Sequence, residues 1–233
     1  MSTSLRPFFN FYGGKFRAAH HYPVPRYARI VEPFAGAAGY ATRHHERDII
    51  LVERDPIIAG LWRWLIGASE REILTLPHEV RTTVQDLGLA PGPSALIGFW
   101  LNKGVSSPRQ RPSAWMREGR RPRSFWGPEV RQRIASQVGA IRHWTLIEGD
   151  YSEAPDDDAT WFVDPPYQRA GQHYRRSLLD YGALAGWCRG RRGQVIVCEN
   201  EGADWLPFEP HLSIKAREGR GGGRVSAEAM WTR

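Results

Sequence analysis

The chain has 233 residues, of which 41% are hydrophobic and 24% charged, and these proportions are typical of a globular protein with its own core. No stretch approaches the ~18 uninterrupted apolar residues of a membrane span, which excludes a transmembrane protein. The first residues lack the apolar run of a secretory signal, and two cysteines allow at most one disulfide bond. We therefore expect a cytoplasmic protein of one domain, or of one domain with an insertion.

The net charge of the chain is +7, and arginine dominates its basic residues. Only three of the 32 basic residues are lysines, namely Lys15, Lys103 and Lys215, which leaves 29 arginines. Guanidinium groups bind phosphate oxygens and base edges well, so this composition suggests a polyanionic partner. A GC-rich genome would also favour arginine and leave merely a soluble surface, and composition alone does not decide between the two.

Short apolar runs alternate with helical patterns along the first half of the chain. The sequence predicts strands over residues 28–32 and 48–53 with a short helix over 40–45 between them, which makes a strand–helix–strand unit. An amphipathic helix over 56–66 follows, and helical patterns continue over 70–87 and 94–103.

Prolines and glycines interrupt this alternation over residues 104–128, which predicts a loop-like insertion. The alternation then resumes with helices over 129–141 and 178–189, strands over 144–148, 160–163 and 194–198, and an antiparallel pair, 211–216 with 227–231, around a glycine-rich turn. The predicted fold is therefore α/β and Rossmann-like, with a mostly parallel sheet, a C-terminal antiparallel hairpin and a small insertion.

A turn of very small residues, 35–39, follows the strand that ends at Glu32. Small residues let a ligand approach the backbone, and ligands of such sheets bind at the carboxyl ends of the strands. The same residues would also serve simply to pack a helix against the sheet.

Glu53 ends the next predicted strand, where α/β folds often bind the two hydroxyls of a ribose. A solvated Glu53 beside Asp55, the expected cap of the helix that starts at Pro56, is the alternative. The glycines lack the spacing of the dinucleotide fingerprint, and no lysine follows them to bind phosphate. The sequence thus favours a cofactor that is nucleoside-like and carries no pyrophosphate.

Asp164-Pro165-Pro166-Tyr167 follows an apolar strand and forms the most specific pattern in the chain. Two successive prolines stiffen the backbone and remove two N–H donors, which leaves carbonyls free to accept hydrogen bonds. A carboxylate, a fixed carbonyl and a flat ring together suit an amino group on a planar base. These residues are therefore candidate catalytic residues.

In these motifs the chain resembles the Dam-like, alpha-class adenine-specific DNA methyltransferases, which use S-adenosylmethionine. The matching segments are Phe11-Tyr12-Gly13-Gly14-Lys15, Glu32-Pro33-Phe34-Ala35-Gly36 and Asp164-Pro165-Pro166-Tyr167, in the family's order over nearly the whole chain. The resemblance implies the class I methyltransferase fold, with a cofactor-binding half at 1–100, a target-recognition insertion at 101–133 and the remainder of the catalytic domain at 134–233.

The resemblance also implies roles for individual residues. Phe11 and Lys15 would help to hold the cofactor, Gly36 and Gly39 would lie beneath its methionine part, and Glu53 would bind its ribose, although the family often has Asp there. Asp150 and Tyr151 would border its adenine. The complete set expected around the cofactor is Phe11, Lys15, Glu32, Phe34, Gly36, Gly39, Glu53, Asp150, Tyr151 and Asp164.

The predicted insertion concentrates the positive charge of the chain. Residues 101–133 carry nine basic residues against two acidic ones, a net of +7, so the remaining 200 residues are neutral. Trp115, Phe125 and Trp126 offer rings that could stack on bases. A solvated run of charge is the alternative. The residues expected to bind DNA are Lys103, Arg109, Arg111, Trp115, Arg117, Arg120, Arg121 and Arg123.

The resemblance therefore implies a bacterial or phage enzyme, with or without a restriction partner, that methylates the exocyclic amino nitrogen of a flipped adenine in duplex DNA. Alternatives are an enzyme acting on cytosine in DNA or adenine in RNA, and an inactive DNA-binding relative. We expect no metal, because the adjacent pairs His20-His21 and His44-His45 lack further ligands at usable spacing, and we expect a monomer or weak dimer.

Overall fold

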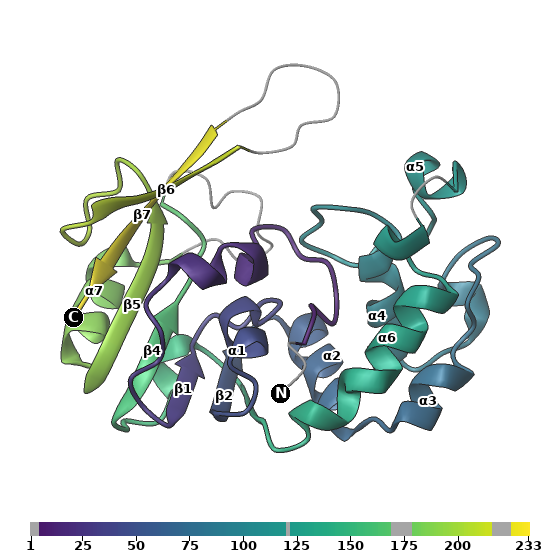
Figure 1. Cartoon of the computed structure of the whole chain (residues 1–233), viewed down its shortest axis with the longest axis horizontal. Coiled ribbons are helices and arrows are strands. Elements are labelled where there is room, and N and C mark those ends of the chain that lie inside the picture. The colour runs from purple at the N-terminus through teal and green to yellow at the C-terminus, as the bar shows by residue number, and fades with distance from the viewer. Residues whose placement is uncertain (1–4, 120–121, 169–178, 216–224) are drawn as a thin grey trace.

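A single seven-stranded sheet organises the protein, in the spatial order β3-β2-β1-β4-β5-β7-β6. The computed structural model describes residues 5–119, 122–168, 179–215 and 225–233 (Figure 1). The strands are β1 (Arg29–Glu32), β2 (Asp48–Glu53), β3 (Thr145–Glu148), β4 (Ala159–Val163), β5 (Gly193–Asn200), β6 (Glu209–Lys215) and β7 (Val225–Thr232).

The first five strands are parallel and follow the doubly wound order 3-2-1-4-5, whereas β7 is antiparallel to both β5 and β6. The predictions of an α/β fold, a mostly parallel sheet and an antiparallel C-terminal pair are confirmed. The glycine-rich turn predicted at 219–223 lies outside the described residues. From β1 the sheet extends in one direction through β2 and β3, and in the opposite direction through β4 and β5. A crevice therefore opens at the carboxyl ends of β1 and β4, where the two directions meet.

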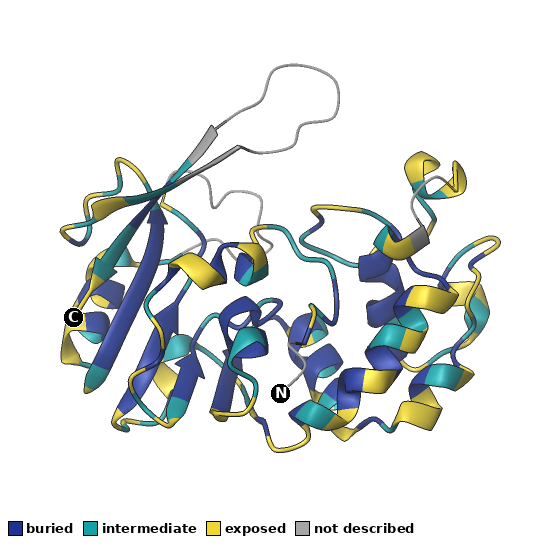
Figure 2. Ribbon diagram, viewed as in Figure 1, coloured by how far each residue is buried: buried dark blue, intermediate teal, exposed yellow. Residues whose placement is uncertain are grey.

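Alternate residues of the strands face opposite sides of the sheet, and both sides are covered by helices. In β1, Ile30 joins the larger core cluster with Trp62 and Phe99, whereas its neighbour Val31 joins a second cluster with Leu184. Figure 2 shows the inner strands as almost wholly buried. Burial on both faces is the normal state of parallel strands and explains their nearly continuous apolar sequences.

The helices separate into a sheet-covering set and a set gathered at one end of the molecule (Figure 1). Helices α1 (Gly39–Arg43), α2 (Pro56–Gly67) and α7 (Tyr181–Gly190) belong with the sheet; α3 (Glu70–Thr75), α4 (Pro91–Trp100), α5 (Ala114–Arg117) and α6 (Pro128–Val138) form the helical end. Asp55 caps α2 by accepting a hydrogen bond from the backbone of Ile57, as predicted.

The helix predicted over residues 70–87 is wrong in its second half. Helix α3 ends at Thr75, and only a 3-10 turn, η3 (Gln85–Leu87), follows. Pro77 explains the early end, because proline disfavours the helical conformation of the residue before it. Helix α4 also begins earlier than predicted, at Pro91, where proline suits the first helical turn.

The insertion is anchored to the body of the protein at both ends. Leu101 and Val105 at its start, and Trp126 and Val130 towards its end, belong to the larger core cluster. Phe125 and Trp126 are 4% and 3% exposed, so the prediction that their rings offer stacking surfaces for DNA is wrong. The indole of Trp126 donates a hydrogen bond to the carbonyl of Pro77 and thereby ties the insertion to the loop after α3.

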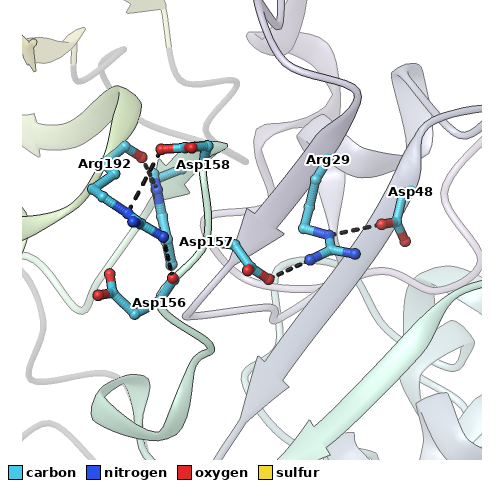
Figure 3. A network of polar contacts seen from close by, with 7 residues as sticks. Arg29, Asp48, Asp156, Asp157, Asp158 and Arg192 are labelled. Atoms are coloured by element: carbon cyan, nitrogen blue, oxygen red, sulfur yellow. Dashed lines mark hydrogen bonds and ion pairs between the residues drawn. The ribbon is translucent and has the colours of Figure 1, made fainter.

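Polar contacts join the amino ends of the strands (Figure 3). Arg29 at the start of β1 pairs with Asp48 at the start of β2 and with Asp157 just before β4, while Arg192 before β5 pairs with Asp158. The acidic run 156–158 therefore aligns neighbouring strands. These groups are substantially exposed, so each pair contributes little to stability by itself.

Two further features bear on the sequence predictions. Cys188 and Cys198 are both free and buried, so they form no disulfide bond with each other and pack in the core. Within the described parts of the chain, no helix combines the length and apolar character needed to cross a membrane.

Gly193 is required where β5 begins beside β4. Its φ is +96°, and a Cβ there would lie 2.3 Å from the carbonyl oxygen of Ala159. We expect Gly193→Ala to lower the free energy of unfolding by at least about 2 kcal/mol, since a left-handed backbone alone costs about 1–3 kcal/mol in a residue with a side chain. Urea unfolding would measure this change.

Gly60→Ala provides the matched control. Gly60 lies within α2, a Cβ added there would meet no neighbouring atom within 4 Å, and alanine favours helices by up to about 1 kcal/mol. Equal stability of the two variants would contradict this explanation.

Candidate active site

A pocket with about 830 Å³ of empty space, open to solvent, lies at the carboxyl ends of β1, β2 and β4. This is the crevice that the reversal of strand order creates. The pocket brings together nine of the ten residues expected around a cofactor: Phe11, Lys15, Glu32, Phe34, Gly36, Gly39, Glu53, Tyr151 and Asp164. Segments far apart in the sequence therefore converge on one site.

The turn after β1 has a conformation that only small residues adopt easily. Gly36 has a φ of +46°, and Ala38 has the strained value of +47°. The indole nitrogen of Trp62 donates to the carbonyl of Gly36 at 2.8 Å, and the backbone of Ala35 donates to Val52. Helix α2 and strand β2 thus fix the floor of the pocket.

Gly39 has a packing role that the sequence did not reveal. A Cβ at this position would lie 2.5 Å from the backbone nitrogen of Phe16 and 2.9 Å from the carbonyl carbon of Lys15. The missing side chain therefore admits the N-terminal 3-10 helix η1 (Lys15–Arg17) against α1. Through this contact, Gly39 determines where Lys15 enters the pocket.

Glu53 links β2 to the glycine turn. Its two carboxylate oxygens accept hydrogen bonds from the backbone nitrogens of Gly36, at 2.9 Å, and Asp55, at 2.8 Å. Burial raises its pKa from 4.5 to about 6, against the lowering effect of these two bonds. Each oxygen has two lone pairs, so Glu53 retains acceptor capacity towards the pocket.

Two aromatic rings form part of the pocket wall. Phe34 and Tyr151 lie 5.4 Å apart between ring centroids and are inclined by only 26°. Asp150, the tenth residue of the predicted set, does not line the pocket. Its carboxylate caps the 3-10 helix η6 (Tyr151–Glu153) by accepting a bond from Ser152, and it lies 3.8 Å from Arg54.

Asp164 lies directly after β4 and is paired with a buried lysine. The ammonium of Lys15, which is 5% exposed, is 3.0 Å from Oδ1 of Asp164 and donates to the carbonyl of Gly13 at 3.1 Å. Burial raises the pKa of Asp164 from 3.8 to about 6, although Lys15 acts to lower it. The carboxylate is thus held at the pocket in a fixed, partly desolvated position.

The rest of the Asp-Pro-Pro-Tyr segment is less exposed to the pocket than the sequence suggested. Pro166 lines the pocket, whereas Pro165 and Tyr167 do not. The Lys15 ammonium lies 4.7 Å from the centre of the Tyr167 ring, so it occupies one face of that ring. The hydroxyl of Tyr181 donates to the Pro166 carbonyl at 2.8 Å and fixes the loop.

Glu32 lies at the back of the pocket and is almost fully buried, with 2% exposure. Its carboxylate accepts a hydrogen bond from the backbone of Ala41 in α1. Burial raises the pKa of Glu32 from 4.5 to about 8, and the nearby charge of Asp164 also raises it. Glu32 therefore supports the junction between β1 and α1 and is mostly protonated near neutral pH.

The structure adds pocket residues that the sequence did not single out. Arg54 follows Glu53 in the chain, and Ser106 comes from the start of the insertion. The backbone of Tyr12 donates to the carbonyl of Val105 at 3.0 Å, which brings the insertion to the pocket. Arg54 could have been predicted as a pocket residue because it directly follows Glu53, whereas no pattern in the sequence indicates Ser106.

Of the residues expected to bind DNA, none of those that the structure describes lines this pocket. Lys103, Arg109, Arg111, Arg117 and Arg123 are exposed, and Trp115 is 43% exposed. Arg120 and Arg121 lie outside the described residues. Arg123 pairs with Glu129, while Arg131 and Arg133 bind the backbone carbonyls of Leu76 and Pro7. The insertion thus contains both exposed and structural arginines.

The buried carboxyl groups predict how stability depends on pH. The folded-state pKa of Glu32 is raised to about 8, so its contribution to stability is fully present below about pH 4.5 and is lost as the pH rises through 8. We expect Glu32→Gln to show a smaller decrease in unfolding free energy between pH 5 and pH 8.5 than the wild type. At about 1.4 kcal/mol per pKa unit, the difference should amount to a few kcal/mol.

Urea unfolding at the two pH values measures this difference. Titratable groups that do not interact with Glu32 contribute equally to both proteins, so their effects cancel in the comparison. If the free energies of unfolding of wild type and Glu32→Gln changed by the same amount between the two pH values, a raised pKa at Glu32 would be contradicted.

Comparison with known proteins does not assign the chain to a family. No protein-family model matches the chain, and no curated protein matches it either. Among solved structures, the chain is similar to a conserved hypothetical protein from Streptococcus pyogenes, at 11% sequence identity and a TM-score of 0.35, over 86% of this chain and 84% of that chain. A similarity this low carries no information about function.

Proposed function

We propose that the protein is a DNA methyltransferase that transfers a methyl group from S-adenosylmethionine to the exocyclic amino nitrogen of adenine in duplex DNA. One observation carries the proposal. The glycine turn after β1, the acid that ends β2 and the Asp-Pro-Pro loop after β4 line a single pocket at the reversal point of the sheet. These are the segments on which the sequence resembles the adenine-specific family.

The pocket suits a cationic nucleoside better than a phosphate-bearing one. Besides Glu32, which is mostly protonated near neutral pH, three carboxyl groups, from Glu53, Asp55 and Asp164, line it together with the two cations Lys15 and Arg54. This excess of acids repels a pyrophosphate and attracts a positive charge. S-adenosylmethionine, when bound, supplies a methyl group on a sulfonium, which carries such a charge.

The lining residues offer a complementary group for each part of such a ligand. The rings of Phe34 and Tyr151 border a flat base, and the remaining lone pairs of Glu53 accept bonds from ribose hydroxyls. Gly36 keeps the backbone close to the rest of the ligand.

Asp164 is the group that orients the amino nitrogen of the target base. Its Oδ1 is engaged by Lys15, so Oδ2 accepts a hydrogen from the amino group. This bond favours a pyramidal nitrogen whose lone pair attacks the methyl carbon as the bond to sulfur breaks. Transfer would leave the electron pair of the broken bond on the leaving sulfur, and the amino nitrogen would then lose a proton. Most of the rate enhancement comes from positioning and from a pre-organised polar site.

The exposed arginines of the insertion provide the affinity for DNA. A base stacked in a duplex does not reach Asp164, so the duplex must release it at a cost of a few kcal/mol. Contacts between guanidinium groups and phosphates supply binding free energy that is independent of sequence. The exposed Trp115 adds a ring beside these cations, with 43% exposure.

Replacement of Asp164 tests the reaction. We expect Asp164→Ala to lower methyl transfer by at least about 100-fold, because the amino group loses its orienting acceptor. Calorimetry should still detect binding of S-adenosylmethionine. Asp158→Asn, at the opposite end of β4 and paired with an exposed arginine, is the control and should retain full activity.

Mass spectrometry of nucleosides from treated DNA and RNA identifies the acceptor. N6-methyladenine in duplex DNA is the expected product. Methylated cytosine, or methylation of RNA alone, would assign a different acceptor, and a wild-type protein that fails to bind S-adenosylmethionine would overturn the proposal.

Salt dependence tests the insertion. Each phosphate contact contributes about 0.9 to the slope of log K against log salt concentration. We expect Arg109→Ala and Arg111→Ala each to reduce that slope by about 0.9. Arg63→Ala, an exposed arginine of α2 outside the insertion, is the control and should leave the slope unchanged. Unchanged slopes in both insertion variants would show that these arginines form only a solvated surface.

A further inference from the structure

A second buried acid stands behind the Lys15–Asp164 pair. Glu228 lies on β7 and is 6% exposed, and its Oε1 is 3.8 Å from the ammonium of Lys15. Its other oxygen, Oε2, accepts a hydrogen bond from the hydroxyl of Tyr22. Tyr22 is itself buried, and its ring packs edge-on against Phe162 of β4 at 5.2 Å. Neither Tyr22 nor Glu228 lines the pocket.

These residues form a series of contacts that ends at the carboxylate of Asp164, the candidate catalytic group. Tyr22 holds Glu228, Glu228 attracts Lys15, and Lys15 binds Oδ1 of Asp164. A buried ammonium is costly unless acceptors surround it. The lysine side chain is also long and flexible, so a single partner does not fix the position of its charge.

We propose that Glu228 and Tyr22 are positioning residues, which hold the Lys15 ammonium against Oδ1 of Asp164 and so leave Oδ2 directed to the target amino group. The inference rests on the proposed function, because it assigns the second oxygen to the acceptor base. The sequence resemblance assigns no role to either residue. They touch neither the pocket nor the reacting atoms, and they act through Lys15.

The net charge of Lys15, Asp164 and Glu228 has a second effect. With both carboxylates ionised, Asp164, Glu228 and Lys15 together carry one negative charge at the edge of the pocket. That charge favours a sulfonium ligand beside Asp164. An isolated Lys15–Asp164 pair would be neutral and would lack this attraction.

Burial and the charge of Glu228 raise the pKa of Asp164, whereas Lys15 and the side chain of Tyr167 lower it. The titratable groups that face Asp164 are Lys15 from η1, Tyr22 after the 3-10 helix η2 (Ala19–His21), Glu32 from β1, Tyr167 after β4, Cys198 from β5 and Glu228 from β7.

Titration of Asp164 directly tests the proposed contacts from Tyr22 through Glu228 and Lys15 to Asp164. In protein labelled with 13C at aspartate carboxyl groups, with Asp164 assigned from Asp164→Asn, the wild-type carboxyl should titrate near pH 6. Lys15→Met should raise that pKa by about one unit or more, and Glu228→Gln should lower it. Glu209→Gln changes an exposed acid of the same hairpin and should leave the titration unchanged.

Kinetics provide the second measurement. Misplacement of a reacting group by about 1 Å lowers the rate up to about 100-fold, so we expect Glu228→Gln and Tyr22→Phe to lower kcat within that range with little change in KM for S-adenosylmethionine. Glu228→Gln should also move the acid limb of the rate profile to lower pH. Tyr22→Phe keeps the ring that packs on Phe162 and loses only the hydroxyl, so it separates positioning from packing.

The outcomes separate this inference from the proposed function. An Asp164 titration that is the same in wild type and Glu228→Gln, or unchanged kcat in both Glu228→Gln and Tyr22→Phe, overturns the positioning role. A wild-type protein that shows the expected titration shifts but transfers no methyl group to DNA overturns the proposed function instead.

Discussion

The close contact between η1 and Gly39 determines how the candidate active-site pocket is assembled. Because Gly39 has no side chain, the backbone of Lys15 and Phe16 packs directly on α1. This places the Lys15 ammonium inside the protein, 3.0 Å from Asp164. A buried ammonium requires nearby acceptors, and buried carboxylates require a nearby cation. Backbone packing at one glycine therefore controls the electrostatics of a site built from strands far away in sequence.

The parallel sheet imposes the second constraint. Glu32, Glu53 and Asp164 all lie at the carboxyl ends of adjacent strands, so the topology concentrates acids at one edge. Burial raises the pKa of each, to about 8 for Glu32 and about 6 for the other two. Such groups lower the stability of the folded state at neutral pH. Carboxyl groups with raised pKa values that converge on one pocket are characteristic of functional sites.

The helical end complements this acidic pocket with exposed cations. Its arginines divide into those that bind backbone carbonyls of the fold, such as Arg131 and Arg133, and those that face solvent, such as Arg109 and Arg111. The start of the insertion also contacts the N-terminal segment through Val105 and Tyr12. An acidic pocket and a basic, solvent-facing segment are thus connected through few residues, as the proposed function requires.

The sequence by itself determined the sheet and most of the pocket, because apolar strands, small turn residues and strand-terminal acids are local patterns. It predicted Glu53 and Asp164 at strand ends, and it placed both near one edge of the sheet. The end of α3 at Thr75 also has a local signal, Pro77, although the periodic pattern alone predicted a longer helix. The burial of Phe125 and Trp126 was not predicted, since it depends on packing against distant segments. Only the tertiary structure brought Glu228 and Tyr22 to Lys15, because β7 inserts beside β5 and carries a residue 206 positions from Tyr22 into contact with it. Contacts of that sequence separation depend on chain topology and leave no periodic signal in the sequence.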